Sequence, residues 1–298
     1  MSKEFLMIVN PVAGRELNNR KVRKRLIKIR KYLGKKNTIH TILTKPNKTI
    51  KEQLIDKNKP DYIIVCGGDG TLNQVTQALF ELKWNVPIGF LPLGTTNDFA
   101  RNFNLPTDIS DINLNNLSKS LKKSDLGKFN DKTFNYVAAM GLFSKTSYTT
   151  DRKSKNLFGR LAYILNGIKE LFSIKSYKLK IKSKEKKIED EFIYVSISNS
   201  NYLGGFDIYR KEDVELDDGE FEVLLVKKPK NFNKSLKLVV DILNGNLNQE
   251  DVYFFKASEL LIEGNEDLEW SLDGEYSGKQ KKIRIKNSQK KVSYIVSK

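Results

Sequence analysis

The sequence is poor in the residues that most often bind metals or form covalent cross-links. Its single cysteine, Cys66, excludes an internal disulfide and a cysteine metal cluster. Its single histidine, His40, excludes a metal site built from several histidines and argues against a Ser-His-Asp triad. Because Cys66 follows an apolar run, we interpret it as a small residue of the core.

Long apolar runs are also absent. The first run, residues 5–9, ends in Asn-Pro and is too short for a signal peptide. No later run approaches the roughly 20 apolar residues that a membrane-spanning helix requires. We therefore expect a soluble, cytoplasmic protein. The sequence has no internal repeat and no Gly/Ser-rich linker. A domain boundary is therefore expected where the spacing of apolar residues changes.

Positive charge is in excess, with 53 Lys and Arg against 36 Asp and Glu and a formal net charge of +17. Nucleic acid, an anionic membrane surface or an anionic small molecule would each explain this excess. The basic stretches at residues 20–25 and 184–187 are most simply solvated faces, and attraction to an anionic surface is the alternative. Net charge alone does not choose the partner.

The N-terminal half alternates short apolar runs with stretches of helical periodicity. The predicted strands lie at residues 5–9, 40–44, 61–65 and 86–92, and the helices between them at residues 22–33, 50–55 and 72–82. This order is typical of parallel βαβ units, whose ligands bind at the carboxyl edge of the sheet. We expect the Asn-Pro loop, Thr44, the glycine loop at residues 66–73 and the loop around Gly94 to meet at that edge.

Near residue 128 the pattern changes to runs in which every second residue is apolar. Such runs are centred on residues 179–181, 193–197, 221–225 and 283–285. This period is typical of half-buried antiparallel strands, as in a sandwich. One helix is predicted at residues 156–172, and its broad apolar stripe is interpreted either as packing on the sheet or as a lipid-facing surface.

The glycine loop reads Cys-Gly-Gly-Asp-Gly-Thr-Leu-Asn and lies between a predicted strand and a predicted helix. Its glycines let the backbone approach something bulky, and the N–H groups at the helix start are suited to phosphate. Asp69 would repel phosphate unless a cation lies between them, which favours a nucleotide bridged by Mg²⁺. The loop is neither a Walker A motif nor the dinucleotide fingerprint, and alone it is also consistent with a tight turn.

A second block, Pro-Leu-Gly-Thr-Thr-Asn-Asp-Phe-Ala-Arg at residues 92–101, makes the pattern more specific. Together the two blocks resemble the catalytic domain of the diacylglycerol kinase and sphingosine kinase superfamily, especially its soluble bacterial lipid kinases. Asn-Pro-Val-Ala-Gly at residues 10–14, Ser-Asp-Leu-Gly at residues 124–127 and Ser-Leu-Asp-Gly-Glu-Tyr at residues 271–276 match further motifs in order. The resemblance covers nearly the whole chain.

The resemblance implies a two-domain α/β plus β fold. An N-terminal Rossmann-like, NAD-kinase-like α/β domain would bind ATP, and a C-terminal antiparallel β-sandwich would bind the lipid. We assign residues 1–128 to the ATP domain, completed by residues 288–298, and residues 129–287 to the sandwich. The active site is expected in the cleft between them.

The resemblance also implies roles for single residues. Glu275 would be the catalytic base, although by itself Asp273-Gly274 is a hairpin turn signal and Glu275 a surface charge. Asp69 would act with Asp98 and Asp125 in a network of Mg²⁺ and water. The implied ATP contacts are Asn10, Pro11, Ala13, Gly14, Thr44, Gly67, Gly68, Asp69, Gly70, Thr71, Asn73, Gly94 and Thr95.

A second, structural Mg²⁺ site is implied before Leu-Asp-Asp-Gly at residues 216–219, with Arg210, Asp213 and Glu215 as its oxygen ligands. An ordinary acidic turn is the alternative. Two departures from the family pattern bear on these assignments. Gln74 stands where many members carry Glu, and Lys-Glu at residues 211–212 replaces a common Pro, which weakens the register of the structural site.

These observations predict a kinase that uses ATP and Mg²⁺ to phosphorylate a membrane lipid, with diacylglycerol as the favoured acceptor. Sphingoid bases, ceramide, phosphatidylglycerol and polyprenols are alternative acceptors. A soluble NAD kinase shares the glycine loop, and a basic nucleic-acid-binding protein would leave the motifs unexplained, so we expect no nucleic acid partner. We expect peripheral association with an anionic membrane surface, and family analogy suggests a homodimer.

Overall fold

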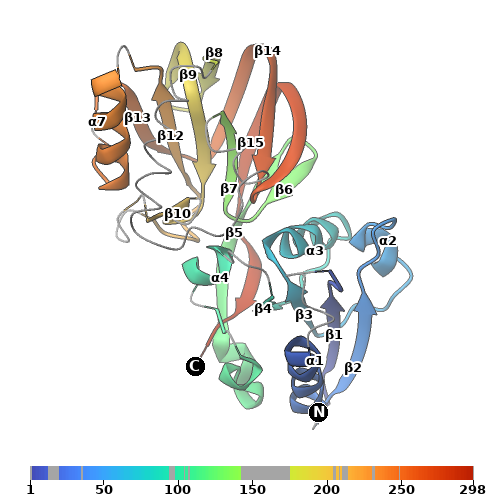
Figure 1. Ribbon diagram of the computed structural model, residues 1–298. Helices are drawn as coiled ribbons and strands as arrows, with labels where there is room; N and C mark the ends of the chain where they lie inside the picture. Colours follow the sequence, from blue (N-terminus) through green and yellow to red (C-terminus); the bar gives the residue numbers. More distant parts are fainter. Residues whose placement is uncertain are drawn as a thin grey trace.

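The computed structural model describes residues 2–12, 20–34, 36–93, 98–103, 105–106, 108–141, 175–203, 206–207, 209, 214–229, 232–247 and 249–297. Figure 1 shows two lobes, an α/β lobe that contains the N-terminus and a β-rich lobe. No helix within these ranges is long and apolar enough to cross a membrane.

The α/β lobe is built on a parallel sheet in the strand order β2-β1-β3-β4. Its strands are β1 (Glu4–Val9), β2 (Thr38–Leu43), β3 (Tyr62–Gly67) and β4 (Ile88–Pro92). The helices that follow the first three are α1 (Arg20–Leu33), α2 (Ile50–Leu54) and α3 (Asp69–Glu81). The βαβ prediction for this half is therefore confirmed.

Side chains alternate across this sheet because successive residues of a strand point to opposite faces. Phe5, Met7 and Val9 of β1 pack in one apolar cluster with Ile29 and Leu33 of α1. On the other face, the intervening residues of β1 pack with α2 and α3. The sheet is thus covered by helices on both faces, and its carboxyl edge points towards the β-rich lobe (Figure 1).

Short helical turns connect the two lobes. They are α4 (Asp98–Asn102), η2 (Ile109–Asp111) and η3 (Leu114–Ser120), and none of them was predicted. Phe99 of α4 stacks on Phe103, with ring centroids 4.5 Å apart, and contacts Tyr294 near the C-terminus at 4.8 Å. These rings belong to an apolar cluster that includes residues of both lobes.

The β-rich lobe is antiparallel, as the period of two predicted. Its main strands are β5 (Leu121–Phe129), β6 (Lys132–Phe134), β7 (Val137–Gly141), β8 (Tyr177–Lys182), β9 (Lys187–Ser198), β12 (Phe221–Lys227), β13 (Val252–Ala257), β14 (Glu259–Leu272) and β15 (Glu275–Ile295). A small separate ribbon pairs β10 (Tyr202–Leu203) with β11 (Phe206–Asp207).

Two strands link the layers of this lobe. Both β7 and β8 pair with β9 and with β14, so these four strands close a ring. An apolar cluster fills the space between the layers and includes Phe129, Phe134, Phe192 and Trp270. The lobe is therefore a sandwich whose two layers are joined through both β7 and β8, as in small closed barrels.

The long strand β15 belongs to both lobes. Its first part pairs with β14, and its last residues pair with β5, while Tyr294 also lies beside Ile88 of β4. A single 13-stranded sheet therefore runs through the molecule. The C-terminus lies beside the α/β lobe (Figure 1).

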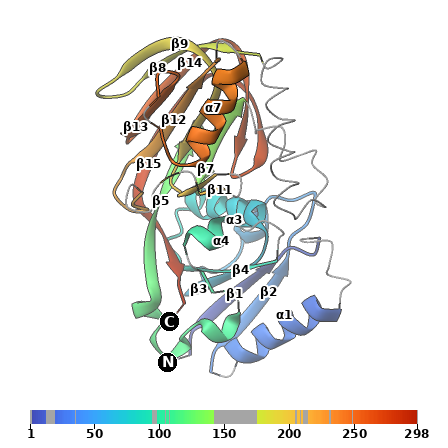
Figure 2. The ribbon, with the colours of Figure 1, turned by 60° about the vertical axis from the view of Figure 1, so that its left-hand side comes forward.

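One further helix, α7 (Phe232–Leu243), was not predicted. It lies against the β-rich lobe (Figure 2), and Leu238 packs in the same cluster as Leu224, Val226 and Val252. The helix predicted at residues 156–172 lies outside the described residues.

Candidate active site

The loops that follow the parallel strands meet at the carboxyl edge of the sheet. The backbone N–H of Asn10 donates to the carbonyl of Cys66 at 2.9 Å, and that of Leu93 to the carbonyl of Gly67 at 2.7 Å. Thr44 donates its N–H to the carbonyl of Val9 at 2.9 Å. The described parts of all four predicted loops therefore converge.

The Asn10 side chain ties the first loop to the glycine loop. Its Nδ2 donates to Oγ1 of Thr71 at 2.9 Å, and its Oδ1 accepts the N–H of Val12 at 3.0 Å. Pro11 lies in the same turn. Asn10 and Thr71, both predicted ATP contacts, are thus in direct contact with each other.

The helix α3 begins at Asp69, and its N-cap residue Gly68 supplies no side-chain hydrogen bond. The first turn of a helix presents N–H groups and a partial positive charge, which attract an anion such as phosphate. The carboxylate of Asp69 lies in this same turn. The N–H groups of a helix start and a carboxylate are therefore adjacent at this turn, and their binding of phosphate and Mg²⁺ stays a prediction.

Two glycines of the loop lie close to neighbouring protein side chains. A Cβ atom on Gly67 would lie 2.6 Å from Cβ and Oγ1 of Thr71. A Cβ atom on Gly70 would lie 2.8 Å from Oε1 of Glu275. The sequence predicted a close approach to something bulky, and at these two positions it is a protein side chain. The Glu275 carboxylate therefore lies against the first turn of α3.

Glu275 is placed by a tight hairpin between β14 and β15. Asp273 and Gly274 both have positive φ, +50° and +83°, as the two central residues of a type I′ turn require. Glu275 pairs with Leu272 and is the first residue of β15. The sequence interpretation of Asp-Gly as a hairpin turn is confirmed.

Asp273 is buried, with 3% of its surface exposed. Its carboxylate accepts the backbone N–H groups of Asn135, Tyr136 and Val137 at 2.7, 2.9 and 3.1 Å. It also accepts the side-chain amides of Asn135 at 2.9 Å and Asn73 at 2.7 Å. Burial raises the pKa of Asp273, and the donors around it act in the opposite direction.

A pocket of about 360 Å³ lies beside Glu275. Its walls come from α3, from the β5–β6 turn and from the start of β15. Lys132 lies in this wall and donates from Nζ to the carbonyl of Ser277 at 2.7 Å. The pocket therefore presents polar groups from both lobes next to the Glu275 carboxylate.

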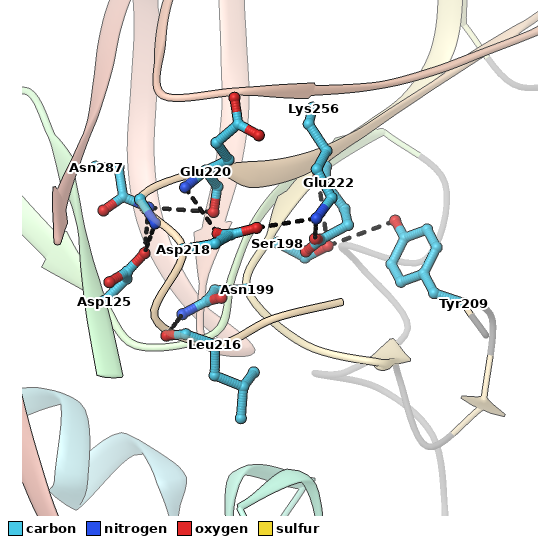
Figure 3. A network of polar contacts seen from close by, with 11 residues as sticks. Asp125, Ser198, Asn199, Tyr209, Leu216, Asp218, Glu220, Glu222, Lys256 and Asn287 are labelled. Carbon is cyan, nitrogen blue, oxygen red and sulfur yellow. Dashed lines mark hydrogen bonds and ion pairs between the residues drawn. The ribbon is translucent and has the colours of Figure 1, made fainter. Parts of the chain in front are cut away.

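Asp125 makes its hydrogen bonds elsewhere. Its Oδ2 accepts the N–H of Gly219 at 2.7 Å and the amide of Asn287 at 3.0 Å, and its Oδ1 accepts the N–H of Lys290 at 2.7 Å. Figure 3 shows this side chain beside Asn287 and the segment containing Asp218 and Glu220. Burial raises the pKa of Asp125. These contacts hold the bend of β15, and none of them reaches the glycine loop.

Several predicted positions lie outside the described residues, namely Ala13, Gly14, Gly94, Thr95, Arg210 and Asp213. Asp98 begins α4, but its side chain is not among those described. Glu215 is exposed. In the part of the chain that the structure describes, no group of three or more His, Cys, Asp or Glu side chains is arranged to hold a metal.

The sequence reasoning missed several polar residues at the contact between the lobes. Asn135, Thr133 and Gln77 belong to no recognisable motif, although all three contribute hydrogen bonds where the lobes meet. Asp273 was interpreted only as a turn residue, because Asp-Gly signals a turn whether or not the carboxylate is buried.

Comparison with known families covers both lobes. Residues 4–129 match the diacylglycerol kinase catalytic domain, and residues 137–286 match the YegS C-terminal NAD kinase beta sandwich-like domain.

Curated relatives align over almost the whole chain. A diacylglycerol kinase of Staphylococcus aureus strain JH9 is 30% identical over 279 residues, covering 94% of this chain and 88% of the relative. A diacylglycerol kinase of Bacillus subtilis strain 168 is 29% identical over 281 residues, covering 93% and 91%.

Solved structures agree with this picture. A diacylglycerol kinase from Bacillus anthracis superposes with a TM-score of 0.72 at 25% identity, covering 99% of this chain and 97% of that one. An NAD kinase from Archaeoglobus fulgidus shares the fold, with a TM-score of 0.53 at 13% identity and coverage of 99% and 94%.

Proposed function

The chain belongs to the diacylglycerol kinase family of lipid kinases, and from this premise we propose that it transfers the γ-phosphate of ATP to the hydroxyl of diacylglycerol. The observation that carries the proposal is the position of Oε1 of Glu275 against Gly70. A carboxylate from the β-rich lobe there meets the helix start that is suited to phosphate.

In this proposal the phosphates of ATP lie at the start of α3. Backbone N–H groups of the first turn and the Thr71 hydroxyl, which Asn10 orients at 2.9 Å, are the donors that would hold them. Thr44, at the adjacent end of β2, lies on the same edge. These contacts bind and position the nucleotide without covalent chemistry, which is the usual way that enzymes promote phosphoryl transfer.

The donor set at this helix start fits Mg²⁺. The ion prefers hard oxygen ligands and is commonly held by one or two carboxylates together with substrate phosphates. Asp69 in the first turn supplies such an oxygen next to the proposed phosphate position. When bound, the ion would neutralise charge on the phosphates. Asp69 would hold it there.

Glu275 is proposed as the general base. Transfer to an alcohol requires an acceptor for the hydroxyl proton within hydrogen-bond reach of the reacting oxygen. Glu275 is the carboxylate that the hairpin turn of the β-rich lobe delivers to the phosphate end of α3. The lipid hydroxyl would therefore approach between Glu275 and the start of α3.

Membrane binding is proposed for the outer face of α1. Lys24, Ile27 and Lys31 lie at helical spacing on one face of α1, and all three are exposed, Ile27 by 68%. Basic residues attract an anionic bilayer surface, and an exposed aliphatic side chain among them favours insertion at the interface. This arrangement would keep the enzyme at the surface that contains its substrate.

The proposal is tested by the product formed from radiolabelled ATP and mixed vesicles. We expect labelled phosphatidic acid when the vesicles contain diacylglycerol. Label on NAD and none on lipid would overturn the proposal, because the two-lobed fold is shared with an NAD kinase.

A further inference from the structure

One face of α3 is engaged by the β-rich lobe. Gly70, Asn73 and Gln77 lie at positions i, i+3 and i+7 and therefore on the same side of the helix. Gly70 is covered by Glu275, and Gln77 accepts the hydroxyl of Thr133 at 2.7 Å. Asn73, between them, faces the same lobe.

The amide nitrogen of Asn73 uses both of its hydrogens in this contact. Its Nδ2 donates to Oδ2 of Asp273 at 2.7 Å and to the carbonyl of Thr133 at 3.0 Å. An amide nitrogen carries two hydrogens, and both are therefore spent on the β-rich lobe. The resemblance implied an ATP contact for Asn73, which stays a prediction.

Asp273 is held rigidly on the other side of the contact. Its other donors, the backbone N–H groups of Asn135, Tyr136 and Val137 and the Asn135 amide, all come from its own lobe. Asn135 is itself fixed by the hydroxyl of Tyr294, which donates to its Oδ1 at 3.0 Å. Asn73 is the donor that α3 supplies to this cluster.

We propose that Asn73 and Asp273 are a positioning pair that fixes the Glu275 carboxylate relative to the phosphate-binding start of α3. Asn73 lies one helical turn after Gly70, and Asp273 lies two residues before Glu275. The inference rests on the proposed function, because it takes Glu275 to be the base.

The position of Glu275 should affect the rate because phosphoryl transfer depends on the geometry of the reacting groups. Phosphoryl transfer gains much of its rate from holding donor, acceptor and base in register, and a displacement of about 1 Å can cost roughly 100-fold. Without Asn73, Oδ2 of Asp273 keeps two donors, both from Asn135, so the bond that is lost is the one that links the two lobes. Loss of the Asn73 amide therefore acts on the turn that carries Glu275, and not on ATP.

The test is a double-mutant cycle with Asn73→Ala and Glu275→Gln, measured as kcat and KM for ATP on diacylglycerol vesicles. We expect Asn73→Ala to lower kcat by roughly 10- to 100-fold while KM for ATP changes by less than about twofold. In the Glu275→Gln background, Asn73→Ala should lower kcat little further, because the base that it positions is already lost.

Gln77→Ala is the matched control. It removes contacts of the same helix with the β5–β6 region, through Thr133 and the carbonyl of Asp131, but none with the Asp273 turn. We expect kcat within about threefold of wild type for this variant. If Asn73→Ala does not fold, Asn73→Ser keeps a polar residue at the position and completes the same cycle.

If the reductions in kcat of the two single variants multiply in the double variant, the positioning pair is overturned and Glu275 remains the base. The same conclusion follows if Asn73→Ala changes only KM for ATP. Wild-type turnover of Glu275→Gln would overturn the base and the pair together. The failure of the pair is thus distinguishable from the failure of the proposed function.

Discussion

At the residue scale, Gly70 lies in the first turn of α3, which contacts the Glu275 carboxylate and is proposed to bind the phosphates of ATP. A glycine inside a helix normally costs about 0.5–1 kcal/mol relative to alanine. Here that cost is offset by room for the Glu275 carboxylate, whose Oε1 would lie 2.8 Å from a Cβ atom. The position therefore gives up some helix stability for the approach of a functional group.

This trade predicts opposite effects of Gly70→Ala on stability and on turnover. The added methyl displaces the end of a flexible side chain, so the fold tolerates it and the helix gains propensity. We expect an unchanged or higher melting temperature with kcat at least about tenfold lower. Thermal melts and vesicle turnover measure the two effects. A variant with wild-type turnover would contradict the placement of Glu275.

Glu222 is a second residue whose burial has a measurable consequence. It is fully buried on β12, and its nearest cation, Nζ of Lys256, lies 3.9 Å from Oε1 and closer to Asp218, at 2.9 Å. Figure 3 shows it beside Lys256 and Ser198. Burial raises the pKa of Glu222 from 4.5 to about 8, so the folded state keeps it protonated at neutral pH.

The raised pKa predicts the pH dependence of stability. Between pH 4.5 and about 8 the unfolded chain ionises Glu222 and the folded chain does not, so this residue lowers the free energy of unfolding as pH rises. Glu222→Gln removes that loss and should raise the free energy of unfolding by a few kcal/mol more at pH 8 than at pH 5.

Urea unfolding of the wild type and of Glu222→Gln at both pH values measures this difference. Glu220→Gln, which makes the same change at a partly exposed neighbour, is the matched control. Equal differences at pH 5 and pH 8 for Glu222→Gln would contradict the raised pKa of this buried acid.

At the scale of elements, α1 is the helix on which we propose that the positive charge of the chain acts. This helix contains no acidic residue, and it lies on the outside of the α/β lobe (Figure 2). Lys28 on the same face is bound to Asp108 at 2.9 Å, whereas Lys24 and Lys31 are exposed beside Ile27. A compact basic and aliphatic surface results.

We predict that the combined change Lys24→Ala, Ile27→Ser and Lys31→Ala weakens binding to anionic vesicles by roughly 10- to 100-fold, at about 1 kcal/mol for each lysine. Vesicle cosedimentation at two salt concentrations measures it. Lys184→Ala with Lys186→Ala removes the same charge from the β8–β9 turn and should bind nearly as wild type. Equal losses in both variants would mean that net charge, not α1, directs the binding.

A helix or strand could be predicted from the sequence where the spacing of its apolar residues fits only one of the two structures. β1 and β3 are apolar throughout because helices cover both faces, and a run such as residues 61–65 is too short for a helix. α7 was missed because Leu-Lys-Leu at residues 236–238 alternates as a strand does, so periodicity did not separate the two structures.

At the scale of the whole molecule, the candidate site depends on contacts between residues far apart in sequence. The motif loops could be placed, because parallel strands bring their carboxyl ends to one edge. The bond between Asn73 and Asp273 joins residues 200 positions apart. Nothing local in either residue indicates the partner, since a turn Asp and a helix Asn are ordinary in isolation.

The same limit applies to Asp125. The resemblance implied that Asp125 acts with Asp69 in a network of Mg²⁺ and water, and the sequence did not show that its hydrogen bonds go to the bend of β15, which is set by the pairing of that strand with β5. The long path of β15 through both lobes is a property of the whole chain. Sequence pattern identified the strand but not the partners of its bend.

The central claim is that the cleft between the lobes phosphorylates a lipid hydroxyl with Glu275 as base. The most direct measurement supplies radiolabelled ATP with Mg²⁺ to the wild type and to Glu275→Gln, in the presence of vesicles containing diacylglycerol, vesicles containing ceramide or phosphatidylglycerol, and free NAD. The account predicts label in phosphatidic acid for the wild type and its near-complete loss in Glu275→Gln, with ATP binding retained. Label in NAD alone, or equal lipid phosphorylation by both proteins, would contradict it.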